Sequence, residues 1–156
     1  MFLLKLADKL QQHKVPYCLV GGLAVVFHGV TRGTMDIDII IHINLKNLTN
    51  AELALKELGL VSRLPIRAKD LAEFRVEYIE KRNLIAWSFV NPKNPSEVVD
   101  IIITHNSKDI KTISMSLYGK KIPVISKPDL IQMKLESGRP QDLEDVKALR
   151  GLDDEG

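Results

Sequence analysis

The amino-acid sequence predicts one domain of the α/β (α+β) class, in which a mixed β-sheet is flanked by helices. Short apolar, β-branched runs alternate along the chain with segments whose apolar residues recur at helical spacing. A turn-rich connection joins two of these runs and favours an antiparallel pair, so the sheet is not expected to be purely parallel. The 156 residues suffice for one compact core but not for two ordinary domains. We assign residues 1–150 to this domain and residues 151–156 to an acidic tail.

The strand predictions rest on apolar, β-branched composition. The strongest signal lies in residues 35–43, where isoleucine occupies five of nine positions. The segment 91–95, with its asparagines and prolines, separates two further strands. The predicted strands span residues 17–20, 35–43, 84–90, 98–104 and 121–125.

The helix predictions rest on spacing and on capping residues. Thr49 and Glu52 have the spacing of a capping box and Gly59 closes that helix, while Ser126 and Asp129 form a second capping box. Other helices are expected over residues 3–10 and 23–29, and from Asp70 with Leu71, Phe74 and Tyr78 on one face. Gly138 and Pro140 break the helix that follows Ser126, and a last helix runs through Leu143, Val146 and Leu149 to Gly151.

Composition restricts the class of protein. Hydrophobic residues make up 45% and charged residues 27%, which is typical of a folded soluble protein, and the net charge is only +2. Basic residues are enriched in the middle of the chain, at Arg63, Arg67, Lys69, Arg75, Lys81 and Arg82. A solvated surface is the main interpretation of this enrichment, and attraction of a polyanion is the alternative.

Neither a disulfide nor a membrane segment is expected. Cys18 is the single cysteine and lies in an apolar run, where a buried inert thiol is favoured over a nucleophile. The N-terminal residues contain charges and lack a cleavage site, so they predict a helix rather than a signal peptide. No apolar run approaches membrane-spanning length, and we expect a cytoplasmic protein.

Asp36 and Asp38 are the first candidate site residues. Two positions apart on a predicted strand, they project from the same face, and neighbouring carboxylates in an apolar strand repel each other unless a cation lies between them. Mg²⁺ prefers carboxylate oxygens and substrate phosphate as ligands. The alternative is a strand end at which both aspartates are simply hydrated.

Asp100 is a third acid within an apolar run, at residues 98–104. If this strand lies beside the first, three carboxylates converge on one or two metal ions, an arrangement suited to displacement at phosphorus. By itself, Asp100 is equally well explained as a solvent-facing residue at a sheet edge.

The pair Gly21-Gly22 follows one predicted strand and precedes a helix. Backbone N–H groups at such a turn can face a phosphate, although a tight turn is the usual meaning of two glycines. The spacing matches neither a P-loop nor a dinucleotide fingerprint. Its position shortly before Asp36, with Arg32 and Thr34 between them, makes it informative.

These motifs resemble the signature of DNA-polymerase-β-type nucleotidyltransferases, especially small prokaryotic members such as lincosamide and aminoglycoside nucleotidyltransferases and AbiEii-type toxin enzymes. The likeness covers residues 17–42, 97–104 and 126–149, whereas residues 44–96 match no family that we can name. The resemblance implies the nucleotidyltransferase fold, Mg²⁺ or Mn²⁺ as cofactor and an NTP, such as ATP, as substrate. It makes Asp36, Asp38 and Asp100 metal ligands and catalytic residues. Gly21 and Gly22 become the phosphate turn, although many members have serine at the second position.

The segment 134–146 is similar to a lysine-and-aspartate helical motif of the AbiEii-type branch. The resemblance implies that Lys134 reaches the nucleotide phosphates, and Arg32 and Thr34 complete the expected nucleotide-binding set. For Asp142 and Asp145 we expect a structural role or orientation of the lysine. The four histidines form no convincing constellation, and His105 in particular is expected to be peripheral.

The leading functional hypothesis is transfer of an NMP unit from an NTP to an acceptor hydroxyl on an antibiotic, tRNA or protein. A second hypothesis is a non-catalytic module of the same fold that binds a nucleotide or a partner protein. A metal-dependent phosphodiesterase or nuclease is a weaker third, because the glycine turn and Lys134 suit a triphosphate better.

Overall fold

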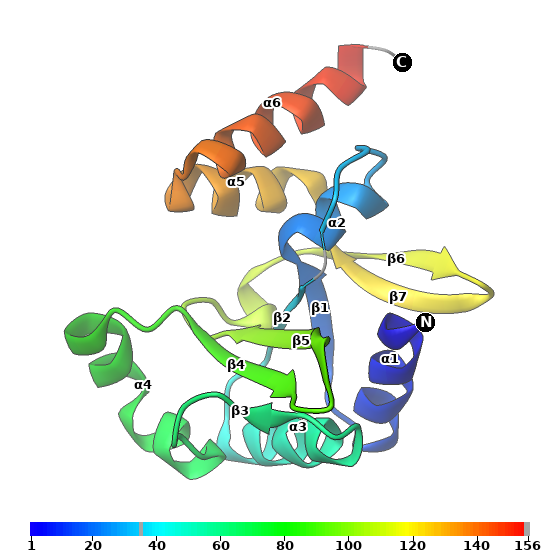
Figure 1. Ribbon diagram of the computed structural model, residues 1–156. Coiled ribbons are helices and arrows are strands. Elements are labelled where there is room, and N and C mark those ends of the chain that lie inside the picture. The colour runs from blue at the N-terminus through cyan, green and yellow to red at the C-terminus, as the bar shows by residue number, and fades with distance from the viewer. Residues whose placement is uncertain (35, 155–156) are drawn as a thin grey trace.

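A computed structural model describes residues 1–34 and 36–154 (Figure 1). Among these residues, the strands form one seven-stranded sheet in the order β3-β4-β5-β2-β1-β7-β6. The strands are β1 (Tyr17–Val20), β2 (Ile37–Ile41), β3 (Val61–Ser62), β4 (Ala86–Asn91), β5 (Asn94–Ile102), β6 (Thr112–Leu117) and β7 (Lys120–Ile125). The helices are α1 (Phe2–Gln12), α2 (Gly21–Phe27), α3 (Leu45–Glu57), α4 (Ala68–Arg82), α5 (Lys127–Ser137) and α6 (Pro140–Asp154).

The sheet is mixed, as the sequence predicts. Strand β2 runs parallel to β5 and antiparallel to β1, while β1 is parallel to β7. Strands β4 and β5 form the expected antiparallel pair. Residues 39–41 of β2 are completely buried, which explains why this strand is a nearly continuous run of isoleucine.

The helices lie in two groups (Figure 1). Helices α1, α3 and α4 lie together at one end of the molecule, and α1 contributes its predicted apolar face to the core. Helices α5 and α6 pack against each other and over α2 at the opposite end. The second group matters for function, because it covers the strand ends that carry the predicted site residues. Among the described residues, no helix is both long and apolar enough to cross a bilayer.

Several boundaries differ from the sequence predictions. Helix α3 begins at Leu45, and its cap is Asn44, whose side chain accepts a hydrogen bond of 2.7 Å from the Asn47 backbone N–H. The predicted capping box at Thr49 is therefore wrong: Thr49 is an exposed residue inside the helix. An asparagine cap is as effective as threonine, and Leu48 adds a buried position before the predicted start.

Helix α4 begins at Ala68, and Asp70 accepts a hydrogen bond of 2.9 Å from the Arg67 N–H. Leu71 is buried as predicted, but Phe74 is 44% exposed and has a non-helical backbone that kinks the helix. The predicted apolar face is therefore wrong at Phe74.

The remaining differences concern strands and the tail. Strand β2 begins at Ile37, so Asp36 precedes it, and Met35 of the predicted strand lies outside the described residues. Strands β3 and β6 were not predicted, and β5 spans Asn94–Ile102 rather than residues 98–104. Helix α6 continues into the acidic segment as far as Asp154.

Candidate active site

The parallel register of β2 and β5 places Asp38 directly beside Asp100. Residues opposite each other on neighbouring strands share a face of the sheet, so the two carboxyl groups form a pair at the centre of the sheet. We call Asp38 and Asp100 the carboxylate pair. Asp36 lies just outside the strand and is exposed. The structure thus brings two of the three predicted acids side by side and leaves the third, Asp36, exposed just before β2.

The environment of Asp38 disfavours its charge. Burial raises the pKa of Asp38 to about 7, and the neighbouring Asp100 and Asp36 carboxyl groups act in the same direction. Lys134 opposes them. A carboxyl group whose charge costs this much is one that a cation would stabilise.

Gly21 lies against this carboxyl group, because β1 pairs Val20 with Asp38 and Gly21 follows at once. Gly21 has a φ of +69°, and a Cβ added here would lie 2.0 Å from Asp38 Oδ2. Both facts require glycine at this position. At Gly22, an added Cβ would lie 2.1 Å from Arg32 Nη1 and 2.9 Å from Thr34 Oγ1. The predicted glycine turn therefore touches three predicted site residues.

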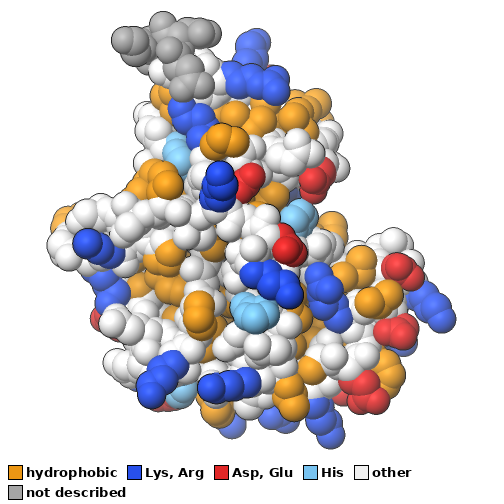
Figure 2. All heavy atoms as spheres, turned by 180° about the vertical axis from the view of Figure 1, so that it is seen from behind, with side chains coloured by type: hydrophobic (Ala, Val, Ile, Leu, Met, Phe, Trp, Pro, Cys, Tyr) orange, Lys and Arg blue, Asp and Glu red, His pale blue; other side chains and the backbone are white. Residues whose placement is uncertain are grey.

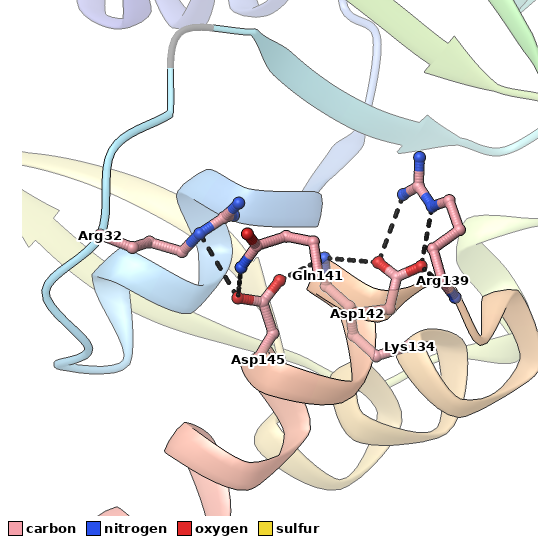
Figure 3. A network of polar contacts seen from close by, with 6 residues as sticks. All are labelled: Arg32, Lys134, Arg139, Gln141, Asp142 and Asp145. Atoms are coloured by element: carbon pink, nitrogen blue, oxygen red, sulfur yellow. Dashed lines mark hydrogen bonds and ion pairs between the residues drawn. The ribbon is translucent and has the colours of Figure 1, made fainter.

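A network of charged side chains lies over this turn (Figure 3). The Lys134 ammonium group lies 2.9 Å from Asp145 Oδ2 and 3.3 Å from Asp142 Oδ1. Asp145 Oδ1 also lies 3.3 Å from Arg32 Nε and accepts a hydrogen bond from Gln141. Asp142 and Asp145 are only 1% and 2% exposed. The buried carboxylates of α6 thus hold Lys134 of α5 and Arg32 of the loop before β2 close together.

Arg139 completes this group, and we call Arg32, Lys134 and Arg139 the cation cluster. Arg139 Nε donates to Asp142 Oδ2 at 2.8 Å, a bond that raises the pKa of Arg139. Burial opposes ionisation of Asp142, but hydrogen bonds from Arg139, Ser137 and Lys134 outweigh it and hold its pKa well below the usual range. Asp142 is therefore an anion at neutral pH and holds two cations in place.

Two cavities meet at these residues. The polar cavity, of about 430 Å³, is bordered by Gly22, Arg32, Thr34 and Asp36. The apolar cavity, of about 310 Å³, is bordered by Ile85, Ile102, Leu130 and Met133. Both are also lined by Asp38, Lys134, Arg139 and Asp142. The shared residues place one member of the carboxylate pair and two members of the cation cluster at the junction.

Most of the predicted site residues converge here, and two features were missed. Arg139 was not among the predicted site residues, yet it lines both cavities. His105 was expected to be peripheral, but it lines the apolar cavity, and this prediction was wrong. Its position shortly after the strand that contains Asp100 is the signal that points to the same edge of the sheet.

The residues present fit a divalent cation by their chemistry. Within residues 1–34 and 36–154, no group of three His, Cys, Asp or Glu side chains is close enough to form a ready-made metal site. The carboxylate pair nevertheless offers oxygen ligands of the kind that Mg²⁺ prefers. The pKa of Asp38 is raised by burial and then by neighbouring carboxyl groups, whose negative charge such an ion would offset. Asp36 has to turn inward to act as a third ligand.

Comparison with known proteins identifies the family and the fold. A family model described as nucleotidyltransferases of unknown function (DUF6036) matches residues 2–152. The chain belongs to this nucleotidyltransferase family. The sequence-based assignment to the nucleotidyltransferase superfamily is confirmed. No curated protein matches the chain by sequence.

Solved structures show the same fold at low sequence identity. A lincosamide antibiotic adenylyltransferase bound to lincomycin is 19% identical, with a TM-score of 0.64 over 95% of this chain and 94% of that one. The antibiotic-resistance factor ANT(2'')-Ia with adenylyl-2''-tobramycin is 13% identical, with a TM-score of 0.61 over 95% and 85%. A nucleotidyltransferase-like protein from Paracoccidioides brasiliensis is 17% identical, with a TM-score of 0.60 over 94% and 72%. The predicted nucleotidyltransferase fold is confirmed.

Proposed function

We propose that this protein transfers a nucleoside monophosphate from a nucleoside triphosphate to a hydroxyl group of an acceptor. The observation that supports this most is that Asp38 of the carboxylate pair lines both cavities together with Lys134 and Arg139 of the cation cluster. Binding of a triphosphate calls for cations, whereas displacement at phosphorus with a divalent cation calls for carboxylates. A site for simple anion binding has no use for two half-buried carboxyl groups placed side by side.

In this proposal, the triphosphate occupies the polar cavity. Arg32 and Lys134 face its phosphates, and Thr34 and the backbone of Gly21-Gly22 complete the binding surface. The Arg139 side chain, which is 73% exposed, still has guanidinium N–H groups to donate to an incoming phosphate while it remains hydrogen-bonded to Asp142. Asp142 and Asp145 orient the cations.

Asp36, Asp38 and Asp100 are the proposed ligands of Mg²⁺ or Mn²⁺. Such an ion, when bound, would offset the charge that develops on the reacting phosphate and on the leaving pyrophosphate. The acceptor oxygen forms a bond to the α-phosphorus while the bond from that phosphorus to the oxygen bridging to the β-phosphate breaks. Pyrophosphate leaves, and the proton of the acceptor hydroxyl passes to the Asp100 carboxylate.

The reaction is tested by incubating the protein with each α-labelled NTP, Mg²⁺ and a cell extract, and by adding lincomycin or tobramycin as acceptors in parallel. We expect label to appear on an acceptor with the wild type and to be lost with Asp38→Asn and Asp100→Asn. Asp109→Asn is the matched control, because Asp109 is an exposed acid in a short 3-10 helix after β5. Label transfer that survives both site substitutions would refute the proposed site.

The competing hypothesis is a non-catalytic binding module. Thermal unfolding with ATP, CTP, GTP and UTP, each with and without Mg²⁺, separates the two. An enzyme of the proposed kind is stabilised by a nucleotide mainly when Mg²⁺ is present. A module binds its nucleotide regardless of the ion and moves no label.

A further inference from the structure

The apolar cavity has a chemical character distinct from that of the polar cavity. Its walls come from the ends of β4 and β5 and from α5, and they include Ile85, Ile102, Leu130 and Met133. Apart from the residues shared with the polar cavity, its lining among the described residues contains no lysine or arginine. Its volume of about 310 Å³ falls at the lower end of small-molecule sites, which span about 300–1,000 Å³.

A polar pair stands at the wall of this cavity. His105 lies 2.9 Å from Thr104 Oγ1 through Nδ1 and 3.1 Å from Glu136 Oε2 through Nε2. Both ring nitrogens are engaged, so the ring is held in place between β5 and α5. The Glu136 side chain is half exposed, and its carboxylate can accept further hydrogen bonds from a ligand.

The geometry of displacement assigns a role to the apolar cavity. In a displacement at phosphorus, the attacking and leaving oxygens lie roughly in line on opposite sides of the phosphorus atom. If the pyrophosphate lies among the cations of the polar cavity and the α-phosphate lies at the Asp38 junction, the attacking hydroxyl approaches from the other cavity. The nucleoside is attached through a different oxygen of the α-phosphate, which does not lie on the line between the attacking and leaving oxygens.

We propose that the apolar cavity is the acceptor subsite and that it takes a small alcohol, neutral or cationic, with an apolar face. The inference rests on the proposed function. The apolar walls exclude a highly hydrated acceptor, and the Glu136 carboxylate disfavours an anionic one. Ligand hydroxyl or ammonium groups can donate to Glu136, with His105 fixing the orientation of that carboxylate.

The surface charge also argues against a polyanionic acceptor such as RNA. On the face shown in Figure 2, lysine and arginine side chains are dispersed among apolar and acidic ones and do not merge into one basic patch. Within α4, the basic residues Lys69, Arg75, Lys81 and Arg82 are matched in number by the acids Asp70, Glu73, Glu77 and Glu80. Nucleic-acid binders instead gather many cations along one surface.

Met133→Trp tests the assignment by filling the apolar cavity, with Leu135→Trp as the matched control on the exposed side of the same helix. Two measurements are made on the wild type and both variants. Calorimetry gives the Kd for whichever NTP binds with Mg²⁺. Incubation with that α-labelled NTP and a cell extract, passed through a membrane of about 3 kDa cut-off, gives the size class of the labelled product.

We expect Met133→Trp to leave the Kd for the NTP within a factor of two and to lower label transfer at least tenfold, with the label of the wild type in the small-molecule fraction. Leu135→Trp should match the wild type in both measurements. A tenfold weaker Kd in Met133→Trp would assign the cavity to the nucleoside and overturn the inference. Label on RNA or protein, or undiminished transfer by Met133→Trp, would also overturn it. Failure of the wild type to bind any NTP would instead refute the proposed function itself.

Discussion

Removal of the charge of Asp145 offers a direct test of how the cation cluster is held. Asp145 is 2% exposed and contacts Lys134 at 2.9 Å and Arg32 at 3.3 Å. Asparagine has nearly the same shape but no charge, so Asp145→Asn leaves two cations short of a partner. Removing one partner of a buried ion pair costs about 3–5 kcal/mol.

The structure moderates this cost. Lys134 keeps Asp142 at 3.3 Å, and the Arg32 side chain is 21% exposed, so it can regain water. We therefore expect Asp145→Asn to lower the free energy of unfolding by about 2–3 kcal/mol. For a domain of this size that corresponds to a fall in Tm of about 4–12 °C.

The assay is thermal unfolding followed by circular dichroism, with urea titration at 25 °C as a second measure. Glu144→Gln is the matched control, because Glu144 is an exposed acid on the same helix, and it should change stability by less than about 0.5 kcal/mol. In a double-mutant cycle, Lys134→Met should cost less in the Asp145→Asn background than in the wild type. If Asp145→Asn unfolds within 1 °C of the wild type, or if the two substitutions are additive, the buried network does not hold the cations as described.

Three further predictions concern other residues of the candidate site. Gly21→Ala should destabilise the protein by more than about 2 kcal/mol, because the new side chain needs a positive φ and overlaps Asp38. Gly22→Ala should destabilise it less, because the flexible Arg32 side chain can move away. Equal Tm values for the two variants would contradict this. In protein treated with EDTA, Asp38→Asn should raise Tm by a few degrees, since it removes the charge of one of two neighbouring half-buried carboxyl groups. A lower Tm would count against the repulsion between them. The folded-state pKa of Asp142 is depressed, so the stability that its ionised form contributes is complete above about pH 4–5 and is lost as the pH falls below the unfolded value of about 3.9. Between pH 3 and 7, the Tm of Asp142→Asn should therefore fall less steeply on the acid side than the Tm of the wild type. Parallel curves would refute this.

Local signals in the sequence predicted most of the elements. Ser126 caps α5 as expected, because a serine three residues before Asp129 is a self-contained signal. The start of α3 was misplaced because Asn44 and Thr49 are both capable caps, and burial of Leu48 decides between them only in the folded chain. Strand β6 alternates Ile113, Met115 and Leu117 with polar residues and was detectable by that period of two.

The site was predictable in its residue types but not in its geometry. An acid inside an apolar strand is unusual enough to single out Asp38 and Asp100 from the sequence. Their pairing depends on β5 lying next to β2, and this strand order is a property of the whole sheet, not of either segment. The position of His105 at the apolar cavity likewise follows from α5 packing beyond the end of β5, which no local pattern specifies.

The charges gathered around the two cavities do not cancel. Six carboxyl groups, those of Asp36, Asp38, Asp100, Glu136, Asp142 and Asp145, stand against the three cations Arg32, Lys134 and Arg139. When all are ionised, an excess of three negative charges remains, although the cations by themselves suggest an anion-binding site. A nucleoside triphosphate brings about four more negative charges, and a net-negative surface repels it at distances shorter than the screening length of about 8 Å at physiological ionic strength. Divalent counter-ions that arrive with the proposed nucleotide would therefore lessen this repulsion, since two such ions offset the charge of about four that the triphosphate itself brings.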